Sequence, residues 1–127
     1  MQETNLFEYA VIRVVPRVDR EEFLNVGVIL YCPSLKFLGL RWSQQSDRLR
    51  TLDPKLDLEE LSHHLHALRA ITVGEDTGGP IGRLDIASRF RWLTATRSTI
   101  LQTSKVHPGL CINPDATLDE LYNKLVL

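Results

Sequence analysis

The sequence predicts an α+β protein in which a small antiparallel sheet, built from three N-terminal strands and one later short strand, is covered by helices. Three runs rich in β-branched and aromatic residues fall within the first 42 residues. Leucines at helical spacing follow, and a helix signal ends the chain. A length of 127 residues is about that of one domain, so we expect residues 1–127 to form a single domain.

The first three strands are expected at residues 9–15, 25–32 and 35–42. Pro16 ends the first strand, and Pro33-Ser34 forms the turn that connects the second strand to the third. Because side chains alternate across a sheet, one face of these strands is expected to be apolar and to lie against helices. Its members are Ala10, Ile12, Val14, Val26, Val28, Leu30, Cys32, Leu38, Leu40 and Trp42.

The opposite face combines polar side chains with glycines at positions 27 and 39. A glycine within a strand indicates either the close approach of another backbone or room for a ligand. Arg13 lies on this face inside an apolar run, and a buried guanidinium needs a partner. Two partners remain open for Arg13, namely an anion or a carboxylate of Glu21 or Glu22 in the following loop.

Helix signals follow the third strand. A short helical turn is expected at residues 48–52, before Asp53-Pro54. Asp57 is the expected N-cap of a longer helix whose apolar positions recur at helical spacing from Leu58 to Ile71. The glycine-rich tract 75–82 ends that helix as a surface loop or a lid.

The last third of the chain predicts a second helix over residues 84–93, with Phe90 and Leu93 facing inward. A short fourth strand is expected at residues 99–102, and His107-Pro-Gly109 indicates a turn. Thr117-Leu-Asp-Glu120 has the pattern of a capping box for a final helix.

Composition excludes several classes of protein. The formal net charge of −1 argues against nonspecific nucleic-acid binding, although specific binding stays open. The sequence contains no apolar run long enough for a membrane span and starts without the pattern of a secretion signal, so we expect a cytoplasmic protein without a membrane partner. Cys32 and Cys111 form no C-x-x-C pair and are expected to be buried, reduced thiols.

The strongest functional signal is the segment from Arg89 to Thr99, which holds three arginines, two large aromatic residues and four hydroxyl side chains. Residues 83–107 carry a net charge of +4 against −5 for the remainder. Arginine forks match phosphate oxygens, and hydroxyls can complete the contacts. We hypothesise an anion-binding pocket lined by Arg89, Arg97, Ser98 and His107, with Arg13 from the sheet. Alternatively, the basic segment docks onto the acidic body, with Arg89 and Arg97 joining helix, loop and acidic residues.

No catalytic residue is identified, and the sequence leans away from an enzyme. The histidines of Ser62-His-His-Leu-His66 point in different directions on a helix, so we expect surface histidines and no metal site. Ser98 and His107 lack the surroundings of a nucleophile elbow. Metal-assisted phosphoester cleavage would need convergent carboxylates that the sequence does not bring together. We expect no cofactor.

Four segments in combination resemble the bacterial domain of unknown function 3037 family. They are Phe7-Glu-Tyr-Ala-Val-Ile-Arg13, Arg20-Glu-Glu-Phe-Leu-Asn-Val-Gly-Val-Ile-Leu30, the segment 89–99 and His107-Pro-Gly109. The resemblance covers nearly the whole chain. Family members are often encoded beside a HipA-like kinase, so the resemblance implies an accessory or interaction protein of such a kinase. The alternative is a small phosphate-directed enzyme of the nuclease kind, or a nucleic-acid-binding protein.

Overall fold

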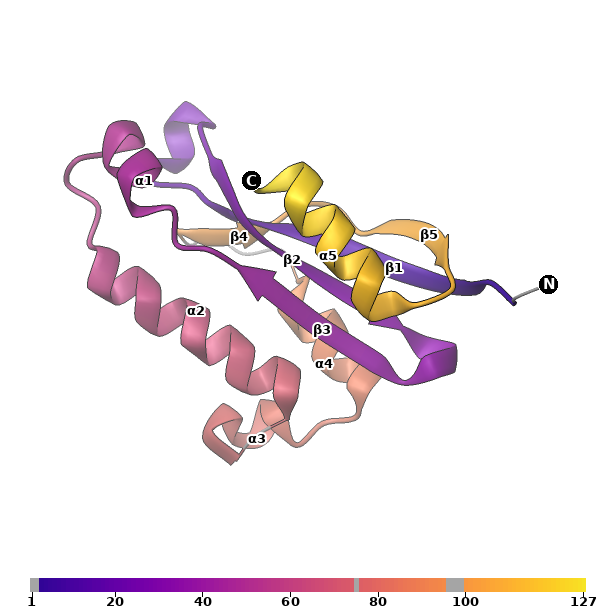
Figure 1. Cartoon of the computed structure of the whole chain (residues 1–127). Coiled ribbons are helices and arrows are strands. Elements are labelled where there is room, and N and C mark those ends of the chain that lie inside the picture. The colour runs from indigo at the N-terminus through magenta and orange to yellow at the C-terminus, as the bar shows by residue number, and fades with distance from the viewer. Residues whose placement is uncertain (1–2, 75, 96–99) are drawn as a thin grey trace.

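The computed structural model describes residues 3–74, 76–95 and 100–127. Its centre is an antiparallel sheet of the strands β1 (Asn5–Val14), β2 (Leu24–Cys32), β3 (Phe37–Trp42), β4 (Leu101–Thr103) and β5 (His107–Cys111). β1 is central. β2 lies on one side of β1 with β3 beyond it, and β5 and β4 share its other side, β5 along the first half and β4 near the end (Figure 1).

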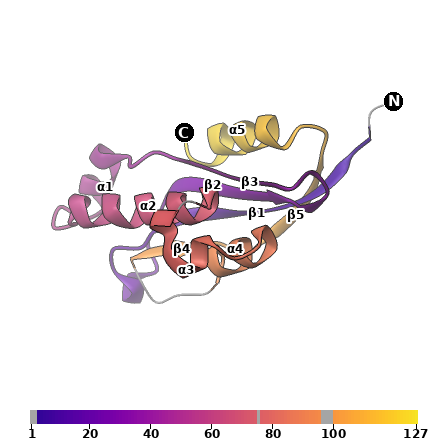
Figure 2. The same cartoon turned by 90° about the horizontal axis from the view of Figure 1, so that it is seen from below.

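Helices cover both faces of this sheet. They are α1 (Ser46–Leu52), α2 (Leu58–Val73), α3 (Gly79–Gly82), α4 (Ile86–Leu93) and α5 (Pro114–Leu125). Figure 2 shows α5 on one side of the sheet and α4 on the other. Single 3₁₀ turns occupy Val18–Arg20, Pro33–Leu35 and Asp76–Gly78. The expected α+β class and helix-covered antiparallel sheet are confirmed.

The larger core lies between the sheet and the pair α2 and α4. Ala10, Ile29 and Leu40 stand at paired positions of β1, β2 and β3 and point to this side. The helices contribute Leu61, Leu65, Leu68, Ile71, Phe90 and Leu93, all buried. The inward positions expected for α2 and α4 are therefore confirmed, because both helices bury the apolar stripe that their spacing indicates.

The face predicted for part of β2 is wrong. Val28 is paired with Val11, so Val28, Leu30 and Cys32 point toward α5 and form a second core with Phe7 and Leu118. The reason is a β-bulge: Ile12 pairs with Gly27 and Arg13 with Asn25, which leaves Val26 as an additional residue in β2. Such a bulge reverses the alternation of side chains on either side of it. Val26 therefore packs with the α2 side.

The strand glycines serve close packing. A Cβ at Gly39 would lie 2.8 Å from Leu118 Cδ2 of α5 and 2.6 Å from the Phe37 ring. A Cβ at Gly27 would lie 2.7 Å from the carbonyl oxygen of Arg41 in the adjacent strand. Gly39 lies on the α5 side of the sheet, whereas Gly27, which pairs with Ile12, lies on the α2 side. The space that each glycine leaves is taken up by α5 or β3, so both glycines allow close packing and neither leaves room for a ligand.

Several local expectations need correction. Residues 107–109 form part of β5 rather than a turn, since Pro108 is tolerated on an edge strand and Gly109 makes room for the Phe7 ring. The tract 75–82 holds a 3₁₀ turn and α3, and the fourth strand lies at Leu101–Thr103.

The last helix begins at Pro114, because Asn113, not Thr117, accepts hydrogen bonds from the backbone of Asp115 and Ala116.

Candidate functional site

Arg89 is a structural cation at the C-terminal end of α2. Its Nη1 donates hydrogen bonds to the carbonyl oxygens of Ile71 (3.0 Å) and Thr72 (2.9 Å). The last carbonyls of a helix lack partners inside the helix and carry partial negative charge, so a guanidinium there satisfies both needs. Gly74 ends α2 with a φ of 83°, and a Cβ at this position would lie 2.8 Å from Arg89 Nη1.

His107 lies on the other face of the sheet from α4. It is the first residue of β5, it is exposed, and its ring lies 5.3 Å from that of Tyr9 on β1. Tyr9 and Arg13 share one face of β1, but four residues of an extended strand separate them by about 13 Å at roughly 3.3 Å per residue. Arg13, Arg89 and His107 therefore do not line one pocket. Arg97 and Ser98 lie outside the described residues.

The surface arginine of the same helix, Arg91, lies opposite an acidic group. Its Nη1 is 3.7 Å from Glu8 Oε2 on β1. Together with Arg89, this contact favours docking of the described basic segment onto the body of the protein. An exposed pair of this kind contributes little to stability, about 0–1 kcal/mol.

Arg13 lies near the end of β1, with its guanidinium carbon 4.0 Å from the centre of the Phe23 ring. This is the geometry of a cation–π contact. Neither Glu21 nor Glu22 forms an ion pair with Arg13, so that expectation is wrong, and Arg20 binds Glu22 instead. Arg13 Nε is buried without a hydrogen-bond partner, and burial lowers the pKa of this guanidinium.

Arg13 is connected to the end of α5 through Asn25 of β2, and α1 binds the same end of α5. Asn25 is paired with Arg13 across the strands, and its Nδ2 donates to the carbonyl oxygen of Leu125 (3.2 Å). Arg48 of α1 donates from Nη1 to the next carbonyl, that of Val126 (3.1 Å). Because these two acceptors are consecutive in the chain, Arg48 and Asn25 bind the same end of α5. We call Arg13, Phe23, Asn25 and Arg48 the basic end.

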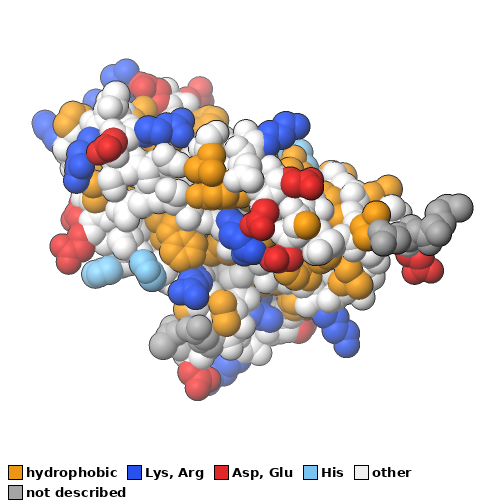
Figure 3. Space-filling view, viewed as in Figure 1, with side chains coloured by type: hydrophobic (Ala, Val, Ile, Leu, Met, Phe, Trp, Pro, Cys, Tyr) orange, Lys and Arg blue, Asp and Glu red, His pale blue; other side chains and the backbone are white. Residues whose placement is uncertain are grey.

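Charges around the basic end are mostly neutralised by near neighbours. Figure 3 shows Lys and Arg side chains, with acidic ones among them, over the end of the molecule that holds α1 and the β1–β2 connection. Ion pairs join Arg17 to Asp19, Arg20 to Glu22 and Arg50 to Asp47. Among the residues that the structure describes, Arg13 and Arg48 have no carboxylate within 4.0 Å.

A hollow of about 380 Å³ adjoins the basic end. Its lining consists of Glu22, Phe23, Leu24, Arg48, Thr51 and Leu52. Phe23 and the two leucines provide an apolar wall, and Arg48 and Thr51 provide donors. Glu22 is the acidic member, and Arg20 offsets its charge. Sequence reasoning missed Arg48 because nothing in the local pattern of α1 shows that this helix packs beside β2 and the end of α5.

Within the described part of the chain, no three histidine, cysteine or acidic side chains gather at a spacing that suits a metal ion. His63, His64 and His66 are exposed, and His66 meets the Trp42 ring edge-on at 5.6 Å. Cys32 and Cys111 are free and buried, as expected. Burial raises the pKa of the Cys111 thiol, and the neighbouring Cys32 adds to this effect.

Fold and site together define an α+β protein with an antiparallel sheet between helices and, at one end, two arginines that have no carboxylate partner in the described part of the chain. None of the helices in the described residues is long and apolar enough to cross a membrane. The chain belongs to the family described as "Protein of unknown function (DUF3037)", which matches residues 9–126. Neither the curated proteins nor the solved structures give a significant match to the chain.

Proposed function

We propose that this protein is a non-enzymatic binding module that holds a phosphate group of a protein partner at the basic end. The observation that carries the proposal is the pair Arg13 and Arg48, which lack carboxylate partners among the described residues while the arginines around them are paired. Guanidinium groups suit the several acceptor oxygens of a phosphate. This site retains Arg13 from the sequence hypothesis and adds Arg48 and Asn25.

A protein partner is supported by an exposed apolar surface at the opposite end of β1. Leu6 and Leu110 are paired across β1 and β5 and are 56% and 67% exposed, and Ile112 beside them is 52% exposed. Grouped apolar side chains on a surface mark interaction sites. The resemblance to a family often encoded beside a HipA-like kinase makes such a cytoplasmic kinase the partner to test.

The proposal is tested by measuring the affinity of the purified chain for a HipA-like kinase by isothermal titration calorimetry. Arg48→Gln is compared with Arg50→Gln, which removes the same charge from the same helix but from an arginine paired with Asp47. We expect Arg48→Gln to weaken binding about tenfold, the equivalent of one charge-assisted hydrogen bond, and Arg50→Gln to leave it unchanged. Treatment of the kinase with a phosphatase is expected to have the same effect as Arg48→Gln.

Three outcomes contradict parts of this proposal. If no complex forms, a HipA-like kinase is not the partner. If the affinity is equal before and after phosphatase treatment, the basic end does not recognise a phosphate group of the kinase. Metal-dependent turnover of a nucleotide or an oligonucleotide by the isolated chain establishes the alternative, a small phosphate-directed enzyme.

A further inference from the structure

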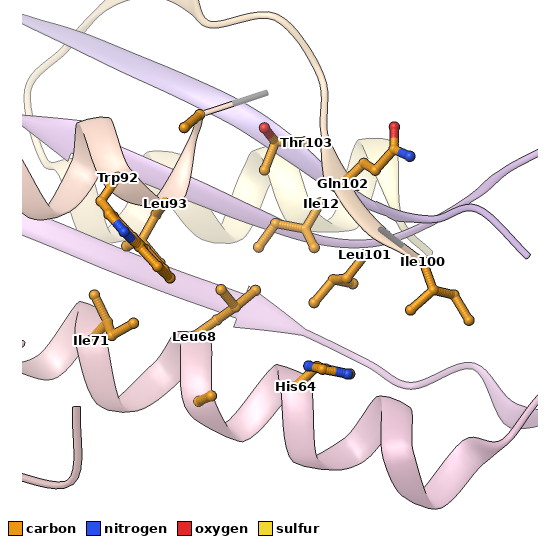
Figure 4. A pocket seen from close by; sticks show the side chains of 12 residues that line it. Ile12, His64, Leu68, Ile71, Trp92, Leu93, Ile100, Leu101, Gln102 and Thr103 are labelled. Atoms are coloured by element: carbon orange, nitrogen blue, oxygen red, sulfur yellow. The ribbon is translucent and has the colours of Figure 1, made fainter. Parts of the chain in front are cut away.

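We propose that the pocket between α2, α4 and β4 binds a single small aromatic ring. The pocket is separate from the basic end and does not depend on the proposed function. Its volume is about 160 Å³. In Figure 4 the side chains that line it converge from α2 below, from α4 on one side and from β4 on the other.

The floor of the pocket is part of the main core. Ile12, Leu68, Ile71, Leu93 and Leu101 line it, and each of them is at most 9% exposed. A buried aliphatic floor offers a ligand dispersion contacts and no hydrogen-bonding groups. The inner part of any ligand must therefore be apolar, since a polar group placed there would be desolvated without compensation.

The rim differs from the floor. Trp92, whose indole points into the pocket in Figure 4, is 37% exposed, and His64 lies across from it on α2. The edge of one aromatic ring is attracted to the face of another, so these two side chains favour an aromatic ligand. Thr103 adds a hydroxyl at the β4 side, whereas the Gln102 side chain points away from the pocket in Figure 4. An apolar floor beneath an aromatic and polar rim suits a ring that carries a hydrogen-bonding group on its outer edge, as phenol does.

The volume sets the size of the ligand. An engineered apolar cavity of about 150 Å³ in another protein binds benzene, and the present pocket is about 160 Å³. A single six-membered ring therefore fills it, whereas a purine attached to its sugar and phosphate does not fit inside. The ring can belong to a free small molecule or to a phenylalanine or tyrosine side chain, because the chemistry of contact is the same.

Fluorescence of Trp92 tests the proposal. The sequence has two tryptophans, so Trp42→Phe leaves Trp92 as the single tryptophan. Phenol, benzene and N-acetyl-phenylalaninamide are titrated separately into this variant. We expect a saturable change of the Trp92 emission, together with a rise of the melting temperature. A response to all three probes indicates that a peptide side chain can enter, and a response to phenol and benzene alone indicates a free ligand.

Ala67→Leu provides the blocking variant, because Ala67 lines the pocket from an exposed position of α2 and leucine fills the space while preserving helix propensity. Ala116→Leu on the exposed side of α5 is the matched control. We expect Ala67→Leu to abolish the saturable response and Ala116→Leu to retain it. The proposal is overturned if no probe gives a saturable response up to its solubility limit, or if Ala67→Leu, with its circular dichroism unchanged, responds like the control.

Discussion

At the scale of single residues, the role of each arginine follows from the groups that face it. Arg89 faces the terminal carbonyls of α2, Arg91 faces Glu8, and Arg13 faces the Phe23 ring. In the sequence these residues look alike, and a dense basic segment therefore indicated one anion site. The acceptors that distinguish them are backbone carbonyls and rings from other elements, which leave no trace in the local sequence.

Replacement of Arg89 is expected to destabilise the protein. Arg89→Met keeps much of the buried stem but leaves the carbonyls of Ile71 and Thr72 without their charged donor. Hydrogen bonds from a charged group contribute about 1.5–3 kcal/mol, so we expect a loss of about 2 kcal/mol in the free energy of unfolding measured by urea titration. Arg83→Met, at an exposed position, is the control and is expected to change it by less than about 0.5 kcal/mol. Equal losses would show that Arg89 has no capping role.

The N-cap of α4, Asp85, predicts how the stability of the protein changes at low pH. Its carboxylate accepts a hydrogen bond from the backbone N–H of Ser88 at 2.7 Å, and this bond lowers the pKa of Asp85 below its ordinary value. A carboxyl with a lowered pKa in the folded state contributes stability above its unfolded value of about 3.9, and this contribution is lost as the pH falls through the lowered value.

The measurement for Asp85 is the free energy of unfolding between about pH 6 and about pH 2, the window in which a lowered carboxyl pKa acts. Asp85→Asn keeps an N-cap side chain without the titrating group. We expect the wild-type protein to lose more stability over this range than Asp85→Asn. Identical pH profiles would contradict the role of the Asp85 carboxylate.

At the scale of elements, the sequence predicts those helices and strands that local residues specify. Asp57 and the leucines after it specify α2, and β-branched runs specify β1, β2 and β3. The bulge at Val26 is set by the pairing of β2 with β1, so alternation alone gave the wrong face for Val28. Similarly, Pro108-Gly109 has the composition of a turn, and only its pairing with β1 makes it a strand.

The start of α5 offers a direct test at this scale. Asn113 Oδ1 accepts from the N–H groups of Asp115 (3.1 Å) and Ala116 (3.3 Å). We expect Asn113→Ala to lower the free energy of unfolding by about 1 kcal/mol, the usual cost of losing an N-cap. Thr117→Ala, at the position that the sequence pattern favoured, is expected to cost about 0.5 kcal/mol or less. The reverse order in thermal or urea unfolding would restore Thr117 as the cap.

At the scale of the whole molecule, helices cover both faces of the sheet, and the basic end and the exposed apolar surface of Leu6 and Leu110 lie toward opposite ends of β1. α5 fills the face that the sequence left open, and Arg41 fastens it through Asp115 (2.6 Å) and Asp119 (2.9 Å). The end of α5 then meets β2 and α1, because Asn25, which pairs with Arg13, donates to Leu125 and Arg48 donates to Val126. Sequence reasoning found Arg13 from its charge within an apolar strand, whereas Arg48 depended on this packing of distant elements.

The central claim, that the basic end binds phosphate, is tested most directly by titrating inorganic phosphate into the ¹⁵N-labelled protein and following the backbone and arginine side-chain signals by NMR. We expect saturable shifts confined to Arg13, Asn25, Arg48 and their neighbours, retained in Arg50→Gln and lost in Arg48→Gln. Shifts centred on Arg83, Arg91 or Lys105, or no saturable shifts at all, would contradict the claim.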